Sequence, residues 1–178
     1  MKTFIEIGSC DFNTLNYLGD LNWKGVIIEP IKKYLDNIPQ KPNIHYLNYA
    51  IDWSRGQRVM FMAEDYIVEQ DRDYAGMSSF YQYNDALSKE ILVNTIPILD
   101  VIKMCDITEI DFLKIDTELY DYEILKMFPF DLISPKIIKV ETRDGLTKLD
   151  TKIGIHNLLI SKGYHIETDT DDTFAIKI

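Results

Sequence analysis

Residues 3–29 have the sequence TFIEIGSCDFNTLNYLGDLNWKGVIIE, in which two short apolar runs flank a helical pattern. The first run, 3–7, predicts a buried strand that ends at Gly8, and segment 12–21 places apolar residues at helical spacing. The second run, 25–28, is apolar and β-branched, as is typical of a buried strand. A strand, a tight turn, a helix and another strand in this order predict a parallel α/β arrangement.

The same alternation continues through most of the chain. Further strands are expected at 44–51, 57–62, 110–115, 136–140, 164–168 and 174–178, and further helices at 31–38, 85–93, 99–105, 119–128 and 153–161. The last two strands are spaced as an antiparallel hairpin. We therefore expect an α/β fold with a mostly parallel sheet, helices on both faces and an antiparallel end.

The length and composition favour one domain. The chain has 178 residues, of which 46% are apolar, enough to bury one sizeable core. We expect a single domain over residues 1–178 with an insertion at about 56–95. Within it, 64–79 is a polar, aromatic and irregular stretch that is long enough to be functional. This insertion is expected to contribute to a substrate site.

The charge and the cysteines exclude several classes of protein. With 29 acidic and 19 basic residues, the net charge of -10 disfavours nucleic-acid and membrane partners. Cys10 and Cys105 are far apart and form no metal spacing, which suits a reducing compartment. No apolar run approaches the roughly 20 residues that span a bilayer, and the start lacks a secretory pattern. We expect a cytoplasmic protein; the net charge does not bear on its oligomeric state.

The residues that follow the first two strands suggest an adenosine site. Ligands of open α/β sheets bind beyond the carboxyl ends of the strands. Gly8 lets the backbone approach a ligand, and Glu29, 21 residues later, is placed to accept hydrogen bonds from both hydroxyls of a ribose. Glu29 has an alternative role, because carboxylates also favour the N-termini of helices.

The turn after the first strand disfavours a dinucleotide. Residues 8–13 keep only the first glycine of the G-x-G-x-x-G pattern that binds a pyrophosphate. Asp11 would repel a diphosphate but attract the ammonium or sulfonium of S-adenosylmethionine, and Glu6 on the strand would support the same group. The pattern favours this methyl donor over NAD.

The chain resembles the FkbM-type methyltransferases over nearly its whole length. The residues that carry this resemblance are 4–8 (FIEIG), 25–30 (GVIIEP), 48–51 (NYAI), Leu99-Asp100, 110–118 (IDFLKIDTE), 139–141 (KVE) and Gly163-Tyr164. The resemblance implies a class I methyltransferase fold, a Rossmann-like three-layer sandwich with a seven-stranded sheet whose last strand is antiparallel. It also implies methyl transfer from S-adenosylmethionine, usually to a hydroxyl of a sugar or natural product. The expected cofactor-binding residues are Glu6, Gly8, Ser9, Asp11, Glu29, Pro30, Ala50 and Ile51.

The sequence departs from this family in two places. Family members usually have a second glycine in the first turn, where this chain has Asp11-Phe12. They also have an Asp-Val-Glu-Gly-like run where this chain has residues 116–119, DTEL. The second departure replaces glycine by Leu119 and changes the expected shape of the acceptor pocket.

Three acids are the candidate catalytic residues. Transfer to a hydroxyl needs a general base near the methyl group, and we assign this role to Asp116. Glu118 and Glu141 would assist it, raise its pKa or hold the acceptor. The three acids also suit a divalent metal such as magnesium or calcium, which we do not favour. As structural alternatives, Asp116 and Glu118 would cap the next helix, and Glu141 would pair with Arg143 or Lys139.

Ser78 and Ser79 are the candidate substrate-binding residues, because binding residues concentrate on loops above rigid sheets. The expected partner is a small-molecule or carbohydrate acceptor. Two other functions stay open at this point. One is a domain of the same fold that binds S-adenosylmethionine without turnover. The other is an NAD-linked oxidoreductase, which would need a phosphate-binding turn that the sequence lacks.

Overall fold

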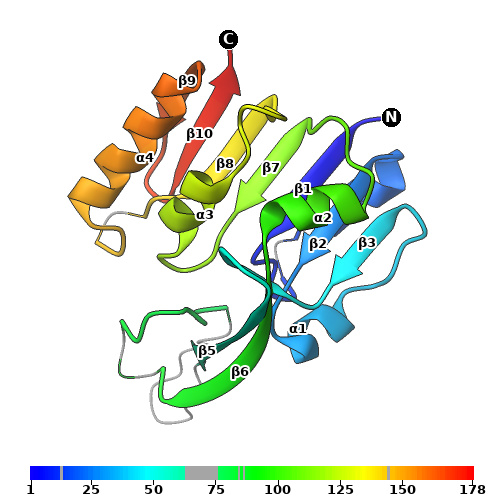
Figure 1. Cartoon of the computed structure of the whole chain (residues 1–178), viewed down its shortest axis with the longest axis vertical. Helices are drawn as coiled ribbons and strands as arrows, with labels where there is room; N and C mark the ends of the chain where they lie inside the picture. The colour runs from blue at the N-terminus through cyan, green and yellow to red at the C-terminus, as the bar shows by residue number, and fades with distance from the viewer. Residues whose placement is uncertain (13, 63–75, 84, 86, 144) are drawn as a thin grey trace.

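The computed structural model describes residues 1–12, 14–62, 76–83, 85, 87–143 and 145–178. Within them, a seven-stranded sheet has the order β3-β2-β1-β7-β8-β10-β9 (Figure 1). Its strands are β1 (Thr3–Ile7), β2 (Lys24–Ile28), β3 (Ile44–Leu47), β7 (Phe112–Ile115), β8 (Ile137–Glu141), β9 (Tyr164–Thr168) and β10 (Asp172–Lys177). The helices are η1 (Leu15–Leu21), α1 (Lys32–Asn37), α2 (Ile98–Met104), α3 (Asp121–Met127) and α4 (Leu149–Ser161).

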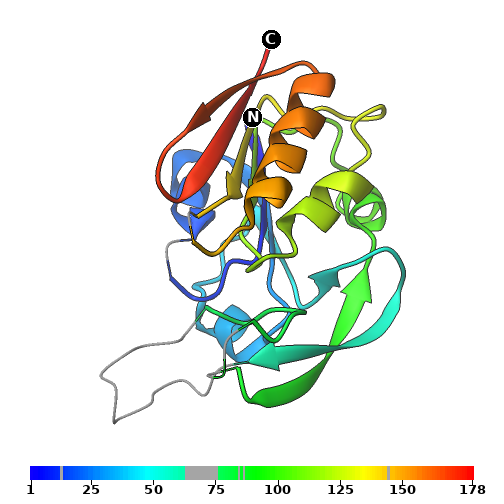
Figure 2. The same ribbon diagram turned by 90° about the vertical axis from the view of Figure 1, so that its left-hand side faces the viewer.

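The sheet confirms the predicted fold class. Strands β3, β2, β1, β7 and β8 pair in parallel, and β10 pairs antiparallel with both β8 and β9. Helices α2, α3 and α4 cover one face, while η1 lies on the other (Figures 1 and 2). Each face has its own hydrophobic core, one built around Ile5 and Leu113 and the other around Phe4 and Ile27. This is a three-layer sandwich of the class I methyltransferase type.

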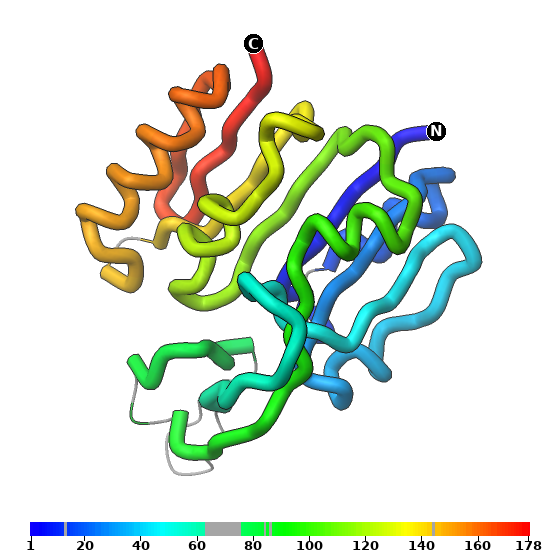
Figure 3. Tube along the Cα trace, viewed as in Figure 1, coloured from blue at the N-terminus to red at the C-terminus, as the bar shows by residue number. Residues whose placement is uncertain are grey.

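A second, three-stranded sheet lies beyond the carboxyl ends of the main strands (Figure 1). It has the order β4-β6-β5, with β4 (Ala50–Ile51), β5 (Gly56–Met62) and β6 (Lys89–Ile96). Strands β5 and β6 form an antiparallel pair in which Arg58 lies opposite Val93. Figure 3 shows β6 leading directly into α2. The small sheet therefore faces the edge at which ligands of α/β sheets bind.

Three predicted elements differ from the structure. Segment 85–93 was expected to be helical, but β6 occupies much of it, because the backbone of β6 pairs with β5 along its length. The strand expected at 44–51 is divided between β3 in the main sheet and β4 in the small one. Segment 12–21 contains the short 3-10 helix η1 in place of an α-helix. The predicted loop at 64–79 lies mostly outside the described residues.

None of the helices that the structure describes combines the length and the apolar character needed to cross a bilayer.

Candidate active site

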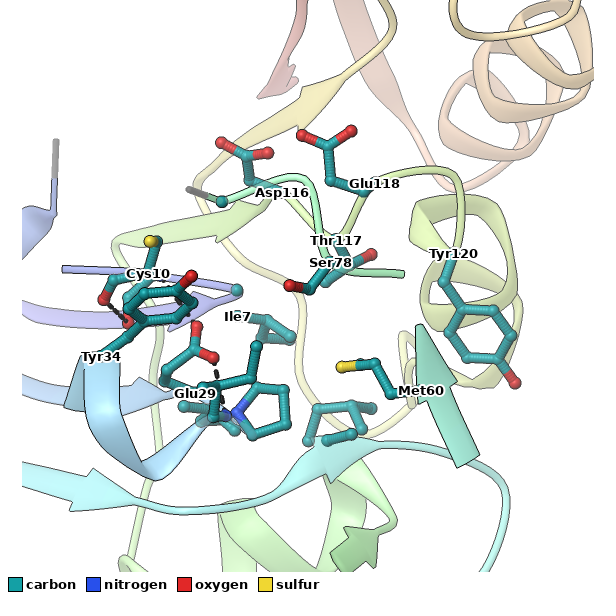
Figure 4. A pocket seen from close by; sticks show the side chains of 18 of the residues that line it. Ile7, Cys10, Glu29, Tyr34, Met60, Ser78, Asp116, Thr117, Glu118 and Tyr120 are labelled. Carbon is teal, nitrogen blue, oxygen red and sulfur yellow. Dashed lines mark hydrogen bonds between the residues drawn. The ribbon is translucent and has the colours of Figure 1, made fainter. Parts of the chain in front are cut away.

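A cavity of about 360 Å³ lies at the carboxyl ends of β1, β2 and β7, next to the small sheet (Figure 4). Its size is within the range of small-molecule sites. Ten of the predicted site residues line it: Gly8, Ser9, Glu29, Pro30, Ala50, Ile51, Ser78, Asp116, Glu118 and Glu141. The structure therefore brings together predicted residues that lie far apart in the sequence, from Gly8 to Glu141. Their roles in binding and catalysis stay predictions.

Gly8 is required by the turn at the end of β1. Its φ of +78° lies in the region that favours glycine, and a Cβ atom there would meet the carbonyl oxygen of Asp116 at 1.9 Å. The Gly8 N–H donates to the carbonyl of Ile28 at 3.0 Å. The ends of β1, β2 and β7 are thus packed closely against one another below the cavity.

Glu29 is a buried carboxylate that joins the turns after β1 and β2. It accepts hydrogen bonds from the backbone N–H groups of Cys10 and Ile31, each at 2.8 Å (Figure 4). Burial raises the pKa of this carboxyl to about 7, although the two backbone hydrogen bonds oppose the shift. The predicted alternative role is partly met as well, because Ile31, whose N–H donates to Glu29, is the N-cap residue of α1. Each oxygen retains lone-pair capacity for a further donor.

The predicted catalytic acids form one cluster. Each of Asp116, Glu118 and Glu141 offers a carboxylate oxygen, and these oxygens all lie within 4.8 Å of one another. Burial and the charges of the other acids raise the pKa of Glu141 to about 9, against the opposing effect of Arg143. Burial also raises the pKa of Glu118, while a hydrogen bond from the Tyr83 hydroxyl at 2.7 Å opposes this. Near neutral pH the cluster therefore holds at least one proton.

The structure tests the alternative roles of these acids, which were capping of the next helix and a surface ion pair. Its N-cap is Tyr120, with no side-chain cap, so neither Asp116 nor Glu118 caps this helix. Asp121 in its first turn instead accepts a hydrogen bond from the N–H of Thr117 at 2.9 Å. Glu141 does pair with Arg143, at 3.5 Å, but its side chain is only 6% exposed. Asp116 and Glu118 do not cap α3, and all three acids line the cavity.

The acidic cluster also has the composition of a metal site. Within the described ranges it is the group of three possible ligands that lie close enough to hold an ion. Carboxylate oxygens suit magnesium or calcium. The same arrangement suits hydrogen bonding to a polar substrate, because a carboxyl that keeps its proton both donates and accepts.

Three predicted site residues do not line the cavity. Glu6 is fully buried and accepts hydrogen bonds from Thr14 and Lys114, so it does not face a ligand as expected. Asp11 accepts a hydrogen bond from the side chain of Asn37 at 2.7 Å. Ser79 is buried, and its hydroxyl donates to the carbonyl of Glu118. These side chains support the walls of the cavity.

The sequence analysis missed a cluster that joins the small sheet to α3. The Tyr120 hydroxyl donates to Asp52 at 2.7 Å, and Arg58 donates to both, at 3.1 Å to Asp52 and 2.9 Å to Tyr120. The Arg58 guanidinium also stacks 4.0 Å from the centre of the Phe80 ring. Tyr120 and Phe80 line the cavity. No spacing in the sequence connects these residues, which come from four separate segments.

Lys114 was missed as well, although a signal was present. It lies within the otherwise apolar strand β7, lines the cavity and is buried beside two carboxylates, Glu6 and Asp116. A charged residue inside a buried strand needs such partners.

Leu119 shows how the departure from the family pattern is accommodated. Glu118 and Leu119 have φ values of 52° and 79°, in the left-handed region. Glycine adopts this conformation without strain, whereas a leucine does so at a cost of about 1–2 kcal/mol. The backbone therefore keeps the shape that a glycine at this position would allow.

Comparison with known proteins agrees with this architecture. Precorrin-6y C5,15-methyltransferase from Geobacter metallireducens GS-15 aligns with 99% of this chain and 80% of its own chain, at a TM-score of 0.50 and 12% identity. A chain in the crystal structure of a fibrillarin/Nop5p complex aligns over 99% of this chain and 73% of its own, at a TM-score of 0.50 and 14% identity. Identities this low bear on the fold alone. No curated protein matches the sequence.

The sequence itself is more specific. The pattern of the methyltransferase FkbM domain matches residues 6–166, which include the end of β1, the acidic cluster and most of β9. The match spans both the main sheet and the small sheet. The chain therefore belongs to the FkbM methyltransferase family.

Proposed function

We propose that this protein is an S-adenosylmethionine-dependent O-methyltransferase that acts on a hydroxyl of a sugar, a glycan or a small natural product. The observation that carries the proposal is one cavity lined by the buried Glu29 and by the cluster of Asp116, Glu118 and Glu141. The first carboxylate suits the ribose of the methyl donor, and the cluster suits a polar acceptor.

The donor fits the half of the cavity formed by β1 and β2. The tight turn at Gly8 brings backbone groups close to the ligand, with Ser9 beside it. Glu29 would accept hydrogen bonds from the ribose hydroxyls, since each of its oxygens has accepted only one backbone N–H. Pro30, Ala50 and Ile51 offer an apolar surface for the adenine.

The acidic cluster would serve the acceptor. When bound, S-adenosylmethionine supplies an electrophilic methyl group. Asp116 would accept the proton of the acceptor hydroxyl as the new carbon–oxygen bond forms, which is general base catalysis. Glu141, whose raised pKa keeps it neutral at pH 7, would donate a hydrogen bond to another acceptor oxygen. Glu118, held by the Tyr83 hydroxyl, would fix the acceptor's orientation.

The proposed partners follow from the charge. A net charge of -10 and an acidic cavity favour a small neutral acceptor over nucleic acid or an anionic membrane surface. We propose that the reaction proceeds without a metal ion. Addition of EDTA should then leave turnover unchanged, whereas a metal bound to the cluster would make turnover sensitive to it.

Calorimetry and a turnover assay test the proposal together. S-adenosylmethionine and its demethylated product should both bind in titration calorimetry, and S-adenosylhomocysteine should be released with at least one member of a panel of methyl glycosides, free sugars and phenols. Absence of binding would end the proposal. An absorbance change with a nicotinamide cofactor would instead favour an oxidoreductase.

A binding module of the same fold is the second candidate. The observation that keeps it open is the left-handed backbone at Glu118 and Leu119, on the acceptor side of the cavity. Strain of this kind is compatible with catalysis but also with a site that has lost it. Tight donor binding with no product release across the whole panel would support the module.

A further inference from the structure

Lys114 is a buried cation at the centre of the main sheet. The register of β1 and β7 places it opposite Glu6. Its side chain is 5% exposed, and its Nζ atom lies 3.0 Å from Glu6 Oε1 and 3.7 Å from Asp116 Oδ2. The ammonium therefore lies between a fully buried carboxylate and one that lines the cavity.

Glu6 is anchored independently of Lys114. The Thr14 hydroxyl donates to Glu6 Oε2 at 2.5 Å, and the Leu15 N–H donates to the same oxygen at 2.8 Å. These bonds fix Glu6 to the segment that begins η1. The charge of Glu6 also raises the pKa of Lys114 despite the opposing effect of burial, so Lys114 stays protonated. Glu6, itself held by Thr14 and Leu15, therefore fixes the position of the Lys114 ammonium.

Stability alone is a weak reason for such a pair. Burying two charges costs several kcal/mol for each ion, and apolar residues of similar volume often give an equally stable protein. Asp116, the second carboxylate beside Lys114, suggests a different reason for burying the pair. The Asp116 side chain is 34% exposed and lines the cavity, so the ammonium couples the buried Glu6 to a carboxylate that a ligand can reach.

We propose that Lys114 is a positioning residue for methyl transfer, whose ammonium, fixed by Glu6, orients the Asp116 carboxylate toward the acceptor. This inference rests on the proposed function, in which Asp116 takes the acceptor proton. Glu6 compensates the charge of Lys114, so the pair adds no net charge near a cationic methyl donor.

The decisive variant is the double substitution Glu6→Gln with Lys114→Met. It removes both charges at nearly constant volume and leaves no unpaired buried ion, so it is expected to fold. Lys114→Arg, which keeps the charge, and Lys114→Met alone are the comparison variants. Crystal structures of the wild type and the double variant report the orientation of Asp116 without any ligand. Titration calorimetry with S-adenosylmethionine and turnover with the best acceptor of the methyl glycoside panel complete the set.

The expected result is that the Asp116 carboxylate turns away from residue 114 in the double variant while the backbone of β7 is unchanged. Donor affinity should stay within about threefold, and kcat should fall at least about tenfold, because small misplacements of a catalytic group are costly. Lys114→Arg should retain more turnover than Lys114→Met. A purely structural role would lower the melting temperature and leave kcat per folded molecule unchanged.

Two outcomes would overturn the inference. One is an Asp116 side chain that keeps its wild-type orientation in the double variant. The other is a double variant with wild-type kcat. Failure of the proposed function is seen separately, as a wild type that transfers no methyl group or an Asp116→Asn variant that keeps its turnover. In that case the crystal structures still decide whether Lys114 positions Asp116.

Discussion

The two sides of the cavity are held in place in different ways. On the side of β1 and β2, Glu29 is held by the backbone N–H groups of Cys10 and Ile31, which belong to the turns after these strands. On the side of α3, Glu118 is held by the side chains of Tyr83 and Ser79, from the segment between β5 and β6. The first side follows directly from the parallel sheet. The second depends on long-range contacts between side chains.

This difference implies that the two sides of the cavity have different roles in the reaction. We expect substitutions on the first side to change affinity for the methyl donor, and substitutions on the second to change turnover or acceptor recognition. The following predictions test that separation, beginning with the largest expected effect.

Asp116→Asn should lower kcat by about 10²–10⁴-fold, the usual contribution of a general base. Donor affinity should stay within about threefold, because Asp116 belongs to the acceptor side. Steady-state kinetics and titration calorimetry measure the two effects. Asp131→Asn, on an exposed carboxylate that does not line the cavity, is the matched control and should change neither. Unchanged turnover in Asp116→Asn would remove the base assignment.

Glu29→Ala should weaken donor binding by about 10- to 100-fold, since hydrogen bonds to a charged group contribute about 1.5–3 kcal/mol. Calorimetry with S-adenosylmethionine measures this change. Glu167→Ala, on an exposed carboxylate of β9, is the control. If Glu29→Ala lowers kcat at saturating donor and leaves the affinity for S-adenosylmethionine intact, the two sides of the cavity do not have separate roles.

Arg58→Leu should raise the KM for the acceptor several-fold and lower the free energy of unfolding by about 1–2 kcal/mol, because its hydrogen bonds to Asp52 and Tyr120 are lost. Donor affinity should not change. Arg55→Leu is a suitable control, as Arg55 forms a surface ion pair with Asp100. Equal effects of the two substitutions would show that the cluster has no special role.

The stability of the unliganded protein should fall as the pH rises from about 7 to about 9. The folded state raises the pKa of Glu141 to about 9, so the folded chain binds more protons than the unfolded chain in this range. The free energy of unfolding therefore decreases with pH there. The raised pKa values of Glu29 and Asp121 lie near 7 and act below this window. Glu141→Gln should flatten the decrease in thermal melts, and Glu167→Gln should not.

Leu119→Gly should stabilise the protein by about 0.5–1 kcal/mol. Glycine removes the cost of about 1–2 kcal/mol for a left-handed leucine, offset by about 0.5–1 kcal/mol for its greater freedom in the unfolded chain. Denaturant unfolding measures the change. The same substitution at Leu132, which is exposed and outside the left-handed residues described, should stabilise nothing. A loss of stability at position 119 would mean that the packing of this leucine outweighs its strain.

The main sheet could be predicted because each strand is a local pattern. Apolar runs such as 3–7 and 110–115 are continuous in sequence, and parallel strands covered on both faces need such runs. Element 85–93 could not be predicted in the same way. Residues 89–93 adopt a strand because β5 lies beside them, and pairing with a distant segment overrides local helical preference.

The candidate site likewise has a part that local sequence patterns predict and a part that they do not. The sequence by itself determined that Gly8, Glu29 and Asp116 meet at one edge, because the carboxyl ends of parallel strands lie together. Only the tertiary structure decided that Glu6 supports Lys114, that Asp11 turns to Asn37, and that Tyr120 joins Asp52 and Arg58. The physical reason is that strand ends are fixed by the backbone, whereas the partner of a side chain depends on packing between segments that are distant in sequence.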